Sequence, residues 1–225
     1  LGMEPEARRE VAAVVRAAAG AATVERLLAV AHALRTAGYG AEAITVARRV
    51  APKQPEPDAR TWRLLYPLAY VDALKAEAAL RGIDPTFAAA LIRQESMYDA
   101  SALSRAGARG LMQLMPEVGR LTARGLRYPQ WDVALLWQPD VNLELGMLHL
   151  SGLMGRYRDP VRVLAAYNAG ASRVERWATK GGVSDPELFA ERIPYAETRD
   201  YVRVIQRNQQ FYRVLYDWPS RALQP

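Results

Sequence analysis

The sequence predicts an all-α protein. Apolar residues recur three and four positions apart along most of the chain, and prolines or short polar residues stand where helices would begin. No pair of alternating apolar segments predicts a β-hairpin. The chain has 225 residues, half of them hydrophobic, and no apolar run approaches the roughly 20 residues of a membrane-spanning helix. No secretory leader is visible, and a start without Met fits a trimmed or mature form.

Residues 1–58 predict a series of short helices. One pair of such helices cannot bury both of its faces, which favours the end of a longer helical-repeat array, while an ordinary three-helix cap fits the same residues. Three prolines within residues 52–58, with charges between them, predict a linker. The expected helices cover residues 5–19, residues 24–35 with Thr23 as N-cap and Gly38 or Gly40 as the stop, and residues 41–50.

Residues 59–225 predict a second, larger helical domain. Asp84 and Pro85 form an N-cap followed by a first-turn proline, and they open the helix that carries Glu95. Apolar residues at spacings of three and four give this helix its buried faces. Further helices are expected from Pro116, from about Val141 to Tyr157 with Asp140 as cap, and from Pro160 to an end at residues 168–170. Pro194 precedes a final long helix to about Tyr216.

The charge of the chain is mild and evenly spread. The formal charge is +6, and only three of the basic residues are lysines. A nucleic-acid-binding protein would concentrate its positive charge, so this class is disfavoured. The spread charge suits non-specific attraction to a polyanionic polymer, or an ordinary solvated surface. Cysteine is absent and His32 and His149 are isolated, so neither a metal site nor another cofactor is expected.

Glu95 is the candidate for acid chemistry. It follows Leu91 and Ile92 by one helical turn, and Met112 and Met115 could cover it from another segment. Apolar neighbours would raise the pKa of a glutamate, so that it stays protonated near neutral pH, as cleavage of a glycosidic bond requires. The alternative is a surface acid paired with a neighbouring arginine.

Two later segments provide further polar groups. Residues 107–116 combine glycines with methionines around Gln113, whose amide could bind a sugar or acetamido group on an apolar floor. A packed turn with methionine as filler fits the same residues. Residues 167–170, Tyr-Asn-Ala-Gly, would place a polar pair at a helix end, although a simple helix cap has the same sequence.

Taken in order, these strings resemble the soluble lytic murein transglycosylase family. Glu-Ser at 95–96 is followed by Gly-Leu-Met-Gln-Leu-Met-Pro at 110–116, by Ala-Tyr-Asn-Ala-Gly at 166–170, and by Ile-Pro-Tyr-Ala-Glu-Thr-Arg-Asp-Tyr-Val at 193–202. The resemblance covers about Tyr66 to Tyr216. It implies a lysozyme-like fold related to goose-type lysozyme, preceded by the end of a superhelical domain.

The resemblance also implies a role for each matching residue. Glu95 would be the single acid and base. Arg199 and Tyr201 would be structural. Two departures, Asp99-Ala100 in place of Asn-Pro and Ala171-Ser172 in place of Pro-Gly, affect loop rigidity more than activity. The implied substrate-binding residues are Ser104, Gln113, Met115, Tyr167, Asn168, Ala169 and Glu197, the last a second acid that is not the nucleophile.

The implied reaction is non-hydrolytic cleavage of peptidoglycan. The bond between N-acetylmuramic acid and N-acetylglucosamine would break and a 1,6-anhydro end would form, which makes the protein a lyase. The alternatives are a goose-lysozyme-like hydrolase, for which Asp99 is the nearby second acid, and a murein-binding module without turnover. The resemblance further implies a monomer in the periplasm or cell envelope that acts on glycan strands, with cell-wall enzymes as partners for the N-terminal helices.

Overall fold

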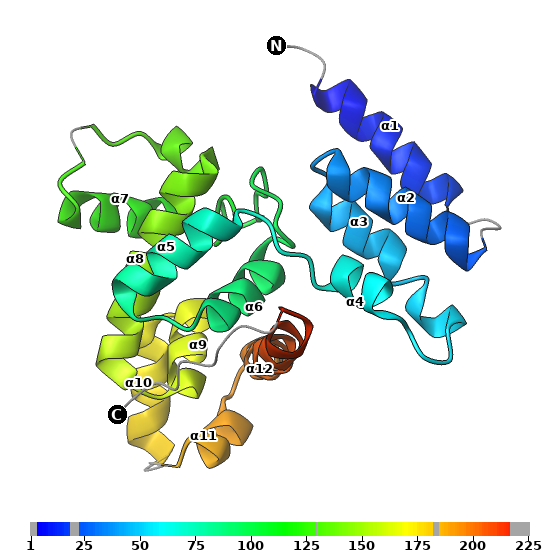
Figure 1. Cartoon of the computed structure of the whole chain (residues 1–225). Helices are drawn as coiled ribbons and strands as arrows, with labels where there is room; N and C mark the ends of the chain where they lie inside the picture. Colours follow the sequence, from blue (N-terminus) through cyan, green and yellow to red (C-terminus); the bar gives the residue numbers. More distant parts are fainter. Residues whose placement is uncertain (1–3, 19–22, 129, 182–184, 217–225) are drawn as a thin grey trace. The chain divides into compact units, whose positions relative to one another are not determined.

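The computed structural model describes residues 4–18, 23–128, 130–181 and 185–216 (Figure 1). Within these ranges the secondary structure is helical, apart from isolated β-bridges that join Arg109 to Leu103 and to Leu114. The chain forms two compact units. Unit 1 comprises Leu1–Ala69 with Ser96–Asp99, and unit 2 comprises Tyr70–Glu95 with Ala100–Pro225. The domain boundary that the sequence predicts, between residues 58 and 59, stays a prediction.

Unit 1 contains the short helices expected near the N-terminus. Thr23 caps its helix as predicted, because its side chain accepts a hydrogen bond from the Arg26 amide at 3.3 Å. Gly38, with φ of +88°, turns the chain after that helix. The helices of unit 1 are α1 (Glu4–Ala17), α2 (Val24–Thr36), α3 (Gly40–Ala47), the 3-10 helix η1 (Ala51–Lys53) and α4 (Ala59–Leu65).

The proline-rich segment 52–58 is partly built into unit 1. Its first residues belong to η1, and Asp58 caps α4 by accepting from the Thr61 amide at 2.9 Å. The Thr61 hydroxyl also donates to Gln54 Oε1 at 2.8 Å. Because of these hydrogen bonds, the segment is more ordered than a flexible linker.

Unit 2 contains the larger set of helices. Among the described residues, five of its helices begin at a proline, whose fixed φ and missing N–H suit the first helical turn. The helices are α5 (Val71–Arg81), α6 (Pro85–Glu95), α7 (Pro116–Gly125), the 3-10 helix η2 (Val133–Trp137), α8 (Pro139–Tyr157), α9 (Pro160–Ala169), α10 (Ala171–Gly181), α11 (Pro186–Arg192) and α12 (Ala196–Tyr216).

The prediction that Asp140 caps α8 is wrong. The helix already begins at Pro139 with Gln138 at the cap position, so Asp140 lies in the first turn. There its carboxylate still faces the positive end of the helix dipole. The other predicted starts of α6, α7 and α9 are confirmed, with Asp84 before α6 and Asp159 as N-cap of α9.

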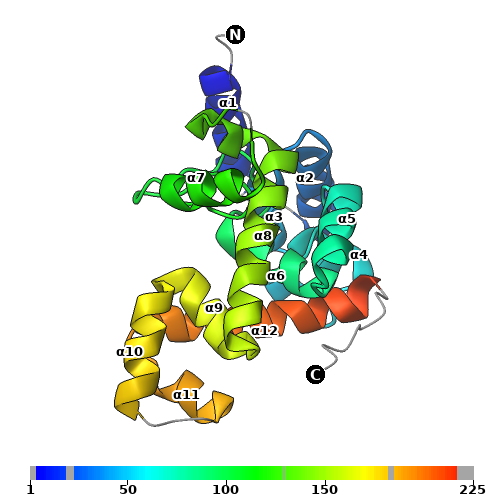
Figure 2. The same cartoon turned by 90° about the vertical axis from the view of Figure 1, so that its left-hand side faces the viewer.

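The core of unit 2 forms where α6, α8, α9 and α12 pack together. Helix α12 packs against both α6 and α9, and α8 packs against α5, α7 and α9 (Figure 2). All residues of α6 from Thr86 to Arg93 are buried, which places the helix that carries Glu95 inside the unit.

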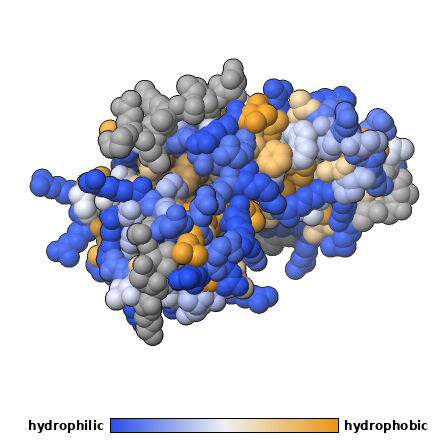
Figure 3. All heavy atoms as spheres, turned by 90° about the horizontal axis from the view of Figure 1, so that it is seen from below, coloured by the Kyte–Doolittle hydropathy of each residue, from blue (hydrophilic) through white to orange (hydrophobic). Residues whose placement is uncertain are grey.

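In the described part of the chain, no helix is both long and apolar enough to cross a membrane. Hydrophilic side chains cover most of the face seen in Figure 3.

Candidate active site

Glu95 is the last residue of α6 and the centre of the candidate site. Its Oε1 accepts a hydrogen bond from the hydroxyl of Tyr201 in α12. Burial raises the pKa of Glu95 to about 7, and the hydrogen bond from Tyr201 offsets only part of this rise. A paired arginine would instead lower the pKa. The geometry therefore favours an acid that stays protonated near neutral pH over a surface acid paired with Arg93.

Two tyrosines accompany the Glu95 carboxyl. The Tyr167 hydroxyl donates to the carbonyl oxygen of Met112 at 2.8 Å. The pKa values of Tyr167 and Tyr201 are raised well above their ordinary value, first by burial and then by the charge of Glu95. Both phenols therefore stay protonated and act as hydrogen-bond donors. Helices α6, α9 and α12 each contribute one member of this cluster.

Tyr201 differs from its sequence interpretation, which gave it a structural role. It lies one helical turn after Glu197, so both share one side of α12. That spacing was the available signal, but the contact of Tyr201 with Glu95 joins residues 106 positions apart. Only the packing of α12 against α6 brings them together.

Asn142, in α8, fixes the loop that contains residues 107–116. Its Oδ1 accepts from the Met112 amide at 2.8 Å, and its Nδ2 donates to the carbonyls of Arg109 at 3.0 Å and Leu136 at 2.9 Å. At Gly110 the loop lies close to the main chain of Leu136. The φ of Gly110 is +75°, and a Cβ there would lie 2.3 Å from the Leu136 carbonyl oxygen. Only glycine fits this position. Asn142 has no local sequence signal for this role.

Gln113 has a different environment from the one predicted. Its φ is 48°, and its Nε2 donates to the carbonyls of Ala102 at 3.1 Å and Gly110 at 2.9 Å. The loop itself thus uses the amide N–H groups, which leaves the side-chain oxygen as the remaining hydrogen-bonding group of this side chain.

The methionines of the loop differ from each other. Met112 is buried against α8, since a Cβ on Gly146 would lie 2.4 Å from its sulfur. Met115 is 41% exposed, directly before α7. Of the two, Met115 is the side chain that is open to a ligand.

Ser104 closes a turn of the same region. Its Oγ accepts from the Ala108 amide at 2.9 Å. Among the described residues, neither Ser104 nor Met115 hydrogen bonds to the Glu95 carboxyl. Their predicted roles beside Glu95 stay predictions.

The remaining predicted residues lie where α9 meets α12. Asn168 is exposed, and its Oδ1 accepts from the Thr198 hydroxyl at 2.7 Å. The Ala169 carbonyl accepts from Arg173 Nη1 at 2.6 Å. Glu197 is exposed in the first turn of α12, next to Thr198. One hydrogen bond therefore brings the Asn168 segment and the Glu197 segment together.

The site offers no metal-binding cluster within the described ranges, because no three His, Cys, Asp or Glu side chains there are grouped closely enough. His149 lies behind the site, with its ring centroid 5.3 Å from that of Tyr167. Burial lowers the pKa of His149, so the imidazole is neutral at pH 7. It acts as a packing partner of Tyr167.

Comparisons with known proteins agree with this geometry. Residues 72–189, more than half of the chain, match the family described as Transglycosylase SLT domain. A Haemophilus influenzae relative is 38% identical over 162 residues, 70% of this chain and 27% of its own length. The soluble lytic murein transglycosylase of Escherichia coli K12 is 34% identical over 151 residues, 66% of this chain and 23% of its own. The chain thus spans about a quarter of these relatives.

Solved structures are also similar. An inactive mutant of the lytic transglycosylase Slt from Pseudomonas aeruginosa superimposes with a TM-score of 0.78 at 31% identity, over 95% of this chain and 34% of that one. The complex of a 70-kDa soluble lytic transglycosylase with bulgecin A gives 0.80 at 26% identity, over 94% and 33%. The predicted all-α, lysozyme-like fold is confirmed. The family match, the sequence relatives and the shared fold lead to one conclusion: the chain belongs to the transglycosylase SLT domain family.

Proposed function

We propose that this protein is a lytic transglycosylase that cleaves the bond between N-acetylmuramic acid and N-acetylglucosamine in peptidoglycan. The observation that supports this most strongly is the half-buried Glu95 beside Tyr201, whose pKa of about 7 keeps a large fraction of its carboxyl protonated at neutral pH. General acid catalysis is most efficient when the pKa of the acid lies near the working pH. Membership of the family supplies the class of substrate.

In the first step, Glu95 donates its proton to the glycosidic oxygen. The bond from that oxygen to C1 of the muramic acid breaks, and the N-acetylglucosamine leaves as an alcohol. Positive charge develops at C1, and the 2-acetamido group of the same sugar stabilises it. The ionised Glu95 is stabilised by the Tyr201 hydroxyl, which donates to it. Burial thus favours the acid before this step and Tyr201 favours the base after it.

In the second step, Glu95 removes the proton from the C6 hydroxyl of the same sugar. The C6 oxygen then bonds to C1, which gives the 1,6-anhydro end and restores the protonated Glu95. One proton leaves the carboxyl and one returns, and no water is consumed. A single carboxyl is therefore sufficient, and a second acid as nucleophile is not needed.

Substrate binding is proposed for the residues that match the family motifs. Tyr167 would position the acetamido group or Glu95, while Asn168, Ala169 and Glu197 would hold neighbouring parts of the strand. Gln113 would accept a hydrogen bond through its side-chain oxygen, and Met115 would supply apolar contact. A few polar groups on an apolar surface are usual in ligand sites. The location of the substrate supports the periplasm or cell envelope as the site of action.

The hydrolase alternative requires a second acid that activates water. Asp99 was the candidate, and it forms an ion pair with Arg8 at 3.9 Å. This pairing supports no catalytic role. The murein-binding alternative is weakened by the raised pKa of Glu95, which a module without turnover does not require.

The test is digestion of purified peptidoglycan by the protein and by Glu95→Gln, followed by mass analysis of the released muropeptides. The P. aeruginosa relative is itself an inactive mutant with glutamine in place of a glutamate. Products one water lighter than hydrolysed ones, absent with the variant, would support the proposal. Hydrated reducing ends would make the protein a hydrolase. No release by intact protein would indicate a binding module.

A further inference from the structure

Helix α12 holds α6 at both of its ends. At the C-terminal end of α6, Tyr201 donates to Glu95. At the N-terminal end, Asp84 binds Gln209 and Arg213, which lie near the end of α12. The two helices therefore run antiparallel. A polar contact, called a fastening below, joins them at each end: Tyr201 with Glu95 at one, and Asp84 with Gln209 and Arg213 at the other.

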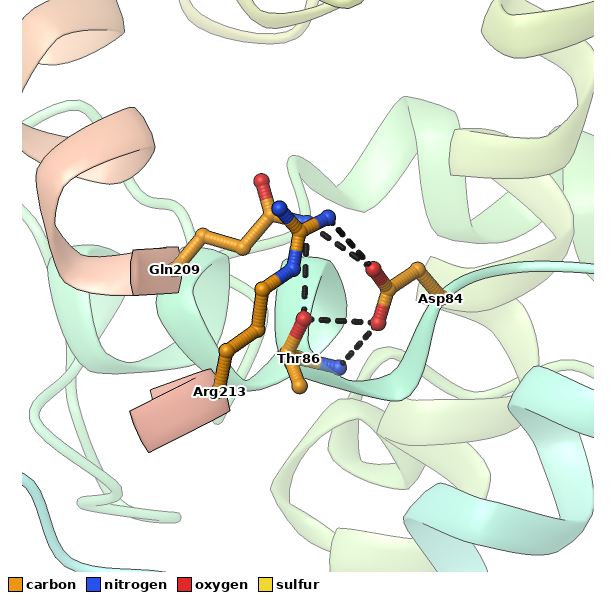
Figure 4. A network of polar contacts seen from close by, with 4 residues as sticks. All are labelled: Asp84, Thr86, Gln209 and Arg213. Carbon is orange, nitrogen blue, oxygen red and sulfur yellow. Dashed lines mark hydrogen bonds and ion pairs between the residues drawn. The ribbon is translucent and has the colours of Figure 1, made fainter. Parts of the chain in front are cut away.

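The fastening at the N-terminal end is a network around Asp84 (Figure 4). Asp84 Oδ1 accepts from the Thr86 amide at 2.8 Å and from the Thr86 hydroxyl at 2.6 Å. Its Oδ2 accepts from Gln209 Nε2 at 3.0 Å and from Arg213 Nη2 at 2.9 Å. Asp84 is only 5% exposed, whereas the Arg213 side chain is 35% exposed. Both carboxylate oxygens are thus used, one by α6 and the other by α12.

The spacing of the two fastenings is matched on the two helices. At 1.5 Å per residue, Asp84 and Glu95 lie about 17 Å apart along α6, and Tyr201 and Arg213 lie about 18 Å apart along α12. A slide of one helix along the other would therefore lengthen both fastenings together. The buried side chains between them resist tilting, but apolar packing alone leaves sliding less well specified than directional hydrogen bonds do.

We propose that the Asp84 network sets the axial position of α6 against α12 and so positions Glu95 for its hydrogen bond with Tyr201. Asp84, Gln209 and Arg213 are then positioning residues that act through Tyr201 and Glu95. The inference builds on the proposed function, in which Glu95 is the acid. Its test, however, reads the ionisation of Glu95 directly and needs no enzymatic activity.

The measurement is the titration of the Glu95 carboxyl by carbon-13 NMR in protein labelled at glutamate, with the Glu95 signal identified by its absence from Glu95→Gln. The Tyr201 hydrogen bond lowers the pKa of Glu95, so loss of good geometry raises it. We expect Arg213→Gln and Asp84→Asn each to raise the Glu95 pKa by about half a unit. Arg213→Lys, which keeps a charged donor, should stay close to wild type.

The two substitutions separate positioning from long-range electrostatics. Removing the positive Arg213 would raise the Glu95 pKa through space, but removing the negative Asp84 would lower it. Positioning predicts a rise in both variants. Shifts of opposite sign would overturn the proposal.

A thermodynamic cycle with Tyr201→Phe completes the test. If Arg213 acts through the Tyr201 hydrogen bond, Arg213→Gln should shift the Glu95 pKa no further once Tyr201 is Phe. The matched control is Arg203→Gln, on the same helix, because Arg203 forms an exposed ion pair with Glu191. The control should leave the titration unchanged.

The proposal fails if Arg213→Gln lowers the melting temperature but leaves the Glu95 titration unchanged, because the network would then be purely structural. It also fails if the shift persists in the Tyr201→Phe background. Should Asp84→Asn not fold, the half-exposed Arg213 still carries the test through the cycle. Loss of peptidoglycan cleavage is not a criterion, so failure of the proposed function would be seen separately.

Discussion

Asp84 and Glu95 lie at opposite ends of α6, the first buried and the second half-buried, and their pKa values move in opposite directions. Burial acts to raise the pKa of Asp84, but hydrogen bonds from Arg213 and Thr86 outweigh it and lower the pKa. Glu95 has Tyr201 as its donor, and burial raises its pKa to about 7. Burial alone therefore does not decide the charge of a carboxyl. The number and charge of its donors do.

The comparison separates two uses of an acid on one helix. Asp84 stays ionised and fastens α6, whereas Glu95 can gain and lose a proton near neutral pH. An arginine beside Glu95 would have made it a second anchor. Burial is the larger of the two influences on the pKa of Glu95, and Arg93 is not among them.

The largest effect is expected for Glu95→Gln. Removal of the only proposed acid should lower peptidoglycan cleavage by about a thousand-fold or more, within the range for general acid catalysis. Release of soluble muropeptides over time is the measurement. Glu191→Gln, which removes an exposed acid on α11, is the control and should keep full activity. Activity of Glu95→Gln within tenfold of wild type would contradict the proposal that Glu95 is the catalytic acid.

The next effect concerns the anchor. Asp84→Ala removes the acceptor for Thr86, Gln209 and Arg213 and should lower the free energy of unfolding by roughly 3 kcal/mol. Chemical denaturation of the folded protein measures this loss. Glu191→Ala should change stability by less than about 0.5 kcal/mol. A similarly small change for Asp84→Ala would contradict its role as an anchor.

The stability of Glu95→Gln relative to wild type should increase as the pH rises. Because the folded pKa of Glu95 lies above its unfolded value of 4.5, its favourable contribution is complete below pH 4.5 and is lost as pH rises through about 7. Glu95→Gln removes that loss. It should therefore be more stable than wild type at pH 8, by roughly 3 kcal/mol, with no such gain at pH 4.

Asp84→Asn provides the mirror experiment. The lowered pKa of Asp84 stabilises the fold above its unfolded value of 3.8, and this stabilisation is lost as pH falls through the folded pKa. The variant should thus be less stable than wild type at pH 8, by an amount that shrinks in strong acid. Thermal melts of both variants across pH measure the two trends. Parallel trends would show that the two carboxyls do not differ as described.

The smallest effect is expected for Tyr201→Phe, which removes the donor that favours ionised Glu95. The pKa of Glu95 should rise further, so the alkaline limb of the pH–activity profile should move upward by about one unit. Activity at neutral pH should fall about tenfold, because the ionised base of the second step is less stable. An unshifted limb with lower activity would indicate a role for Tyr201 in binding only.

Local signals in the sequence were sufficient for several helix starts, and they nominated part of the candidate site. Prolines and capping residues identified α6, α7 and α9 because these effects act within a few residues. Helix α5 was not identified, since it follows Tyr70, which has a φ of 55° and provides no side-chain cap. Helix α10 begins directly after Gly170, which was read only as a stop. Helix α11 was also missed, although Asp185 and Pro186 carry the signal.

The site was predictable where a motif placed a residue on a helix end, and not where contacts cross the fold. Glu95 and Tyr167 came from motifs, and the structure places both near Tyr201. The contacts of Tyr201, Asn142 and Arg213 depend on how helices pack, which no local pattern contains. The Gln113 amide donates to a loop carbonyl from a residue with positive φ. Glutamine in a sequence does not predict a positive φ.

Two side chains hold the main chain of Met112: Asn142 Oδ1 accepts from its N–H, and the Tyr167 hydroxyl donates to its carbonyl. Bonds to main-chain atoms do not depend on which side chain a neighbouring residue carries. The exposed position 115 can therefore be exchanged with little effect on the course of the loop. If Met115 contacts the strand as proposed, substitutions at this position should change saccharide binding without loss of the fold.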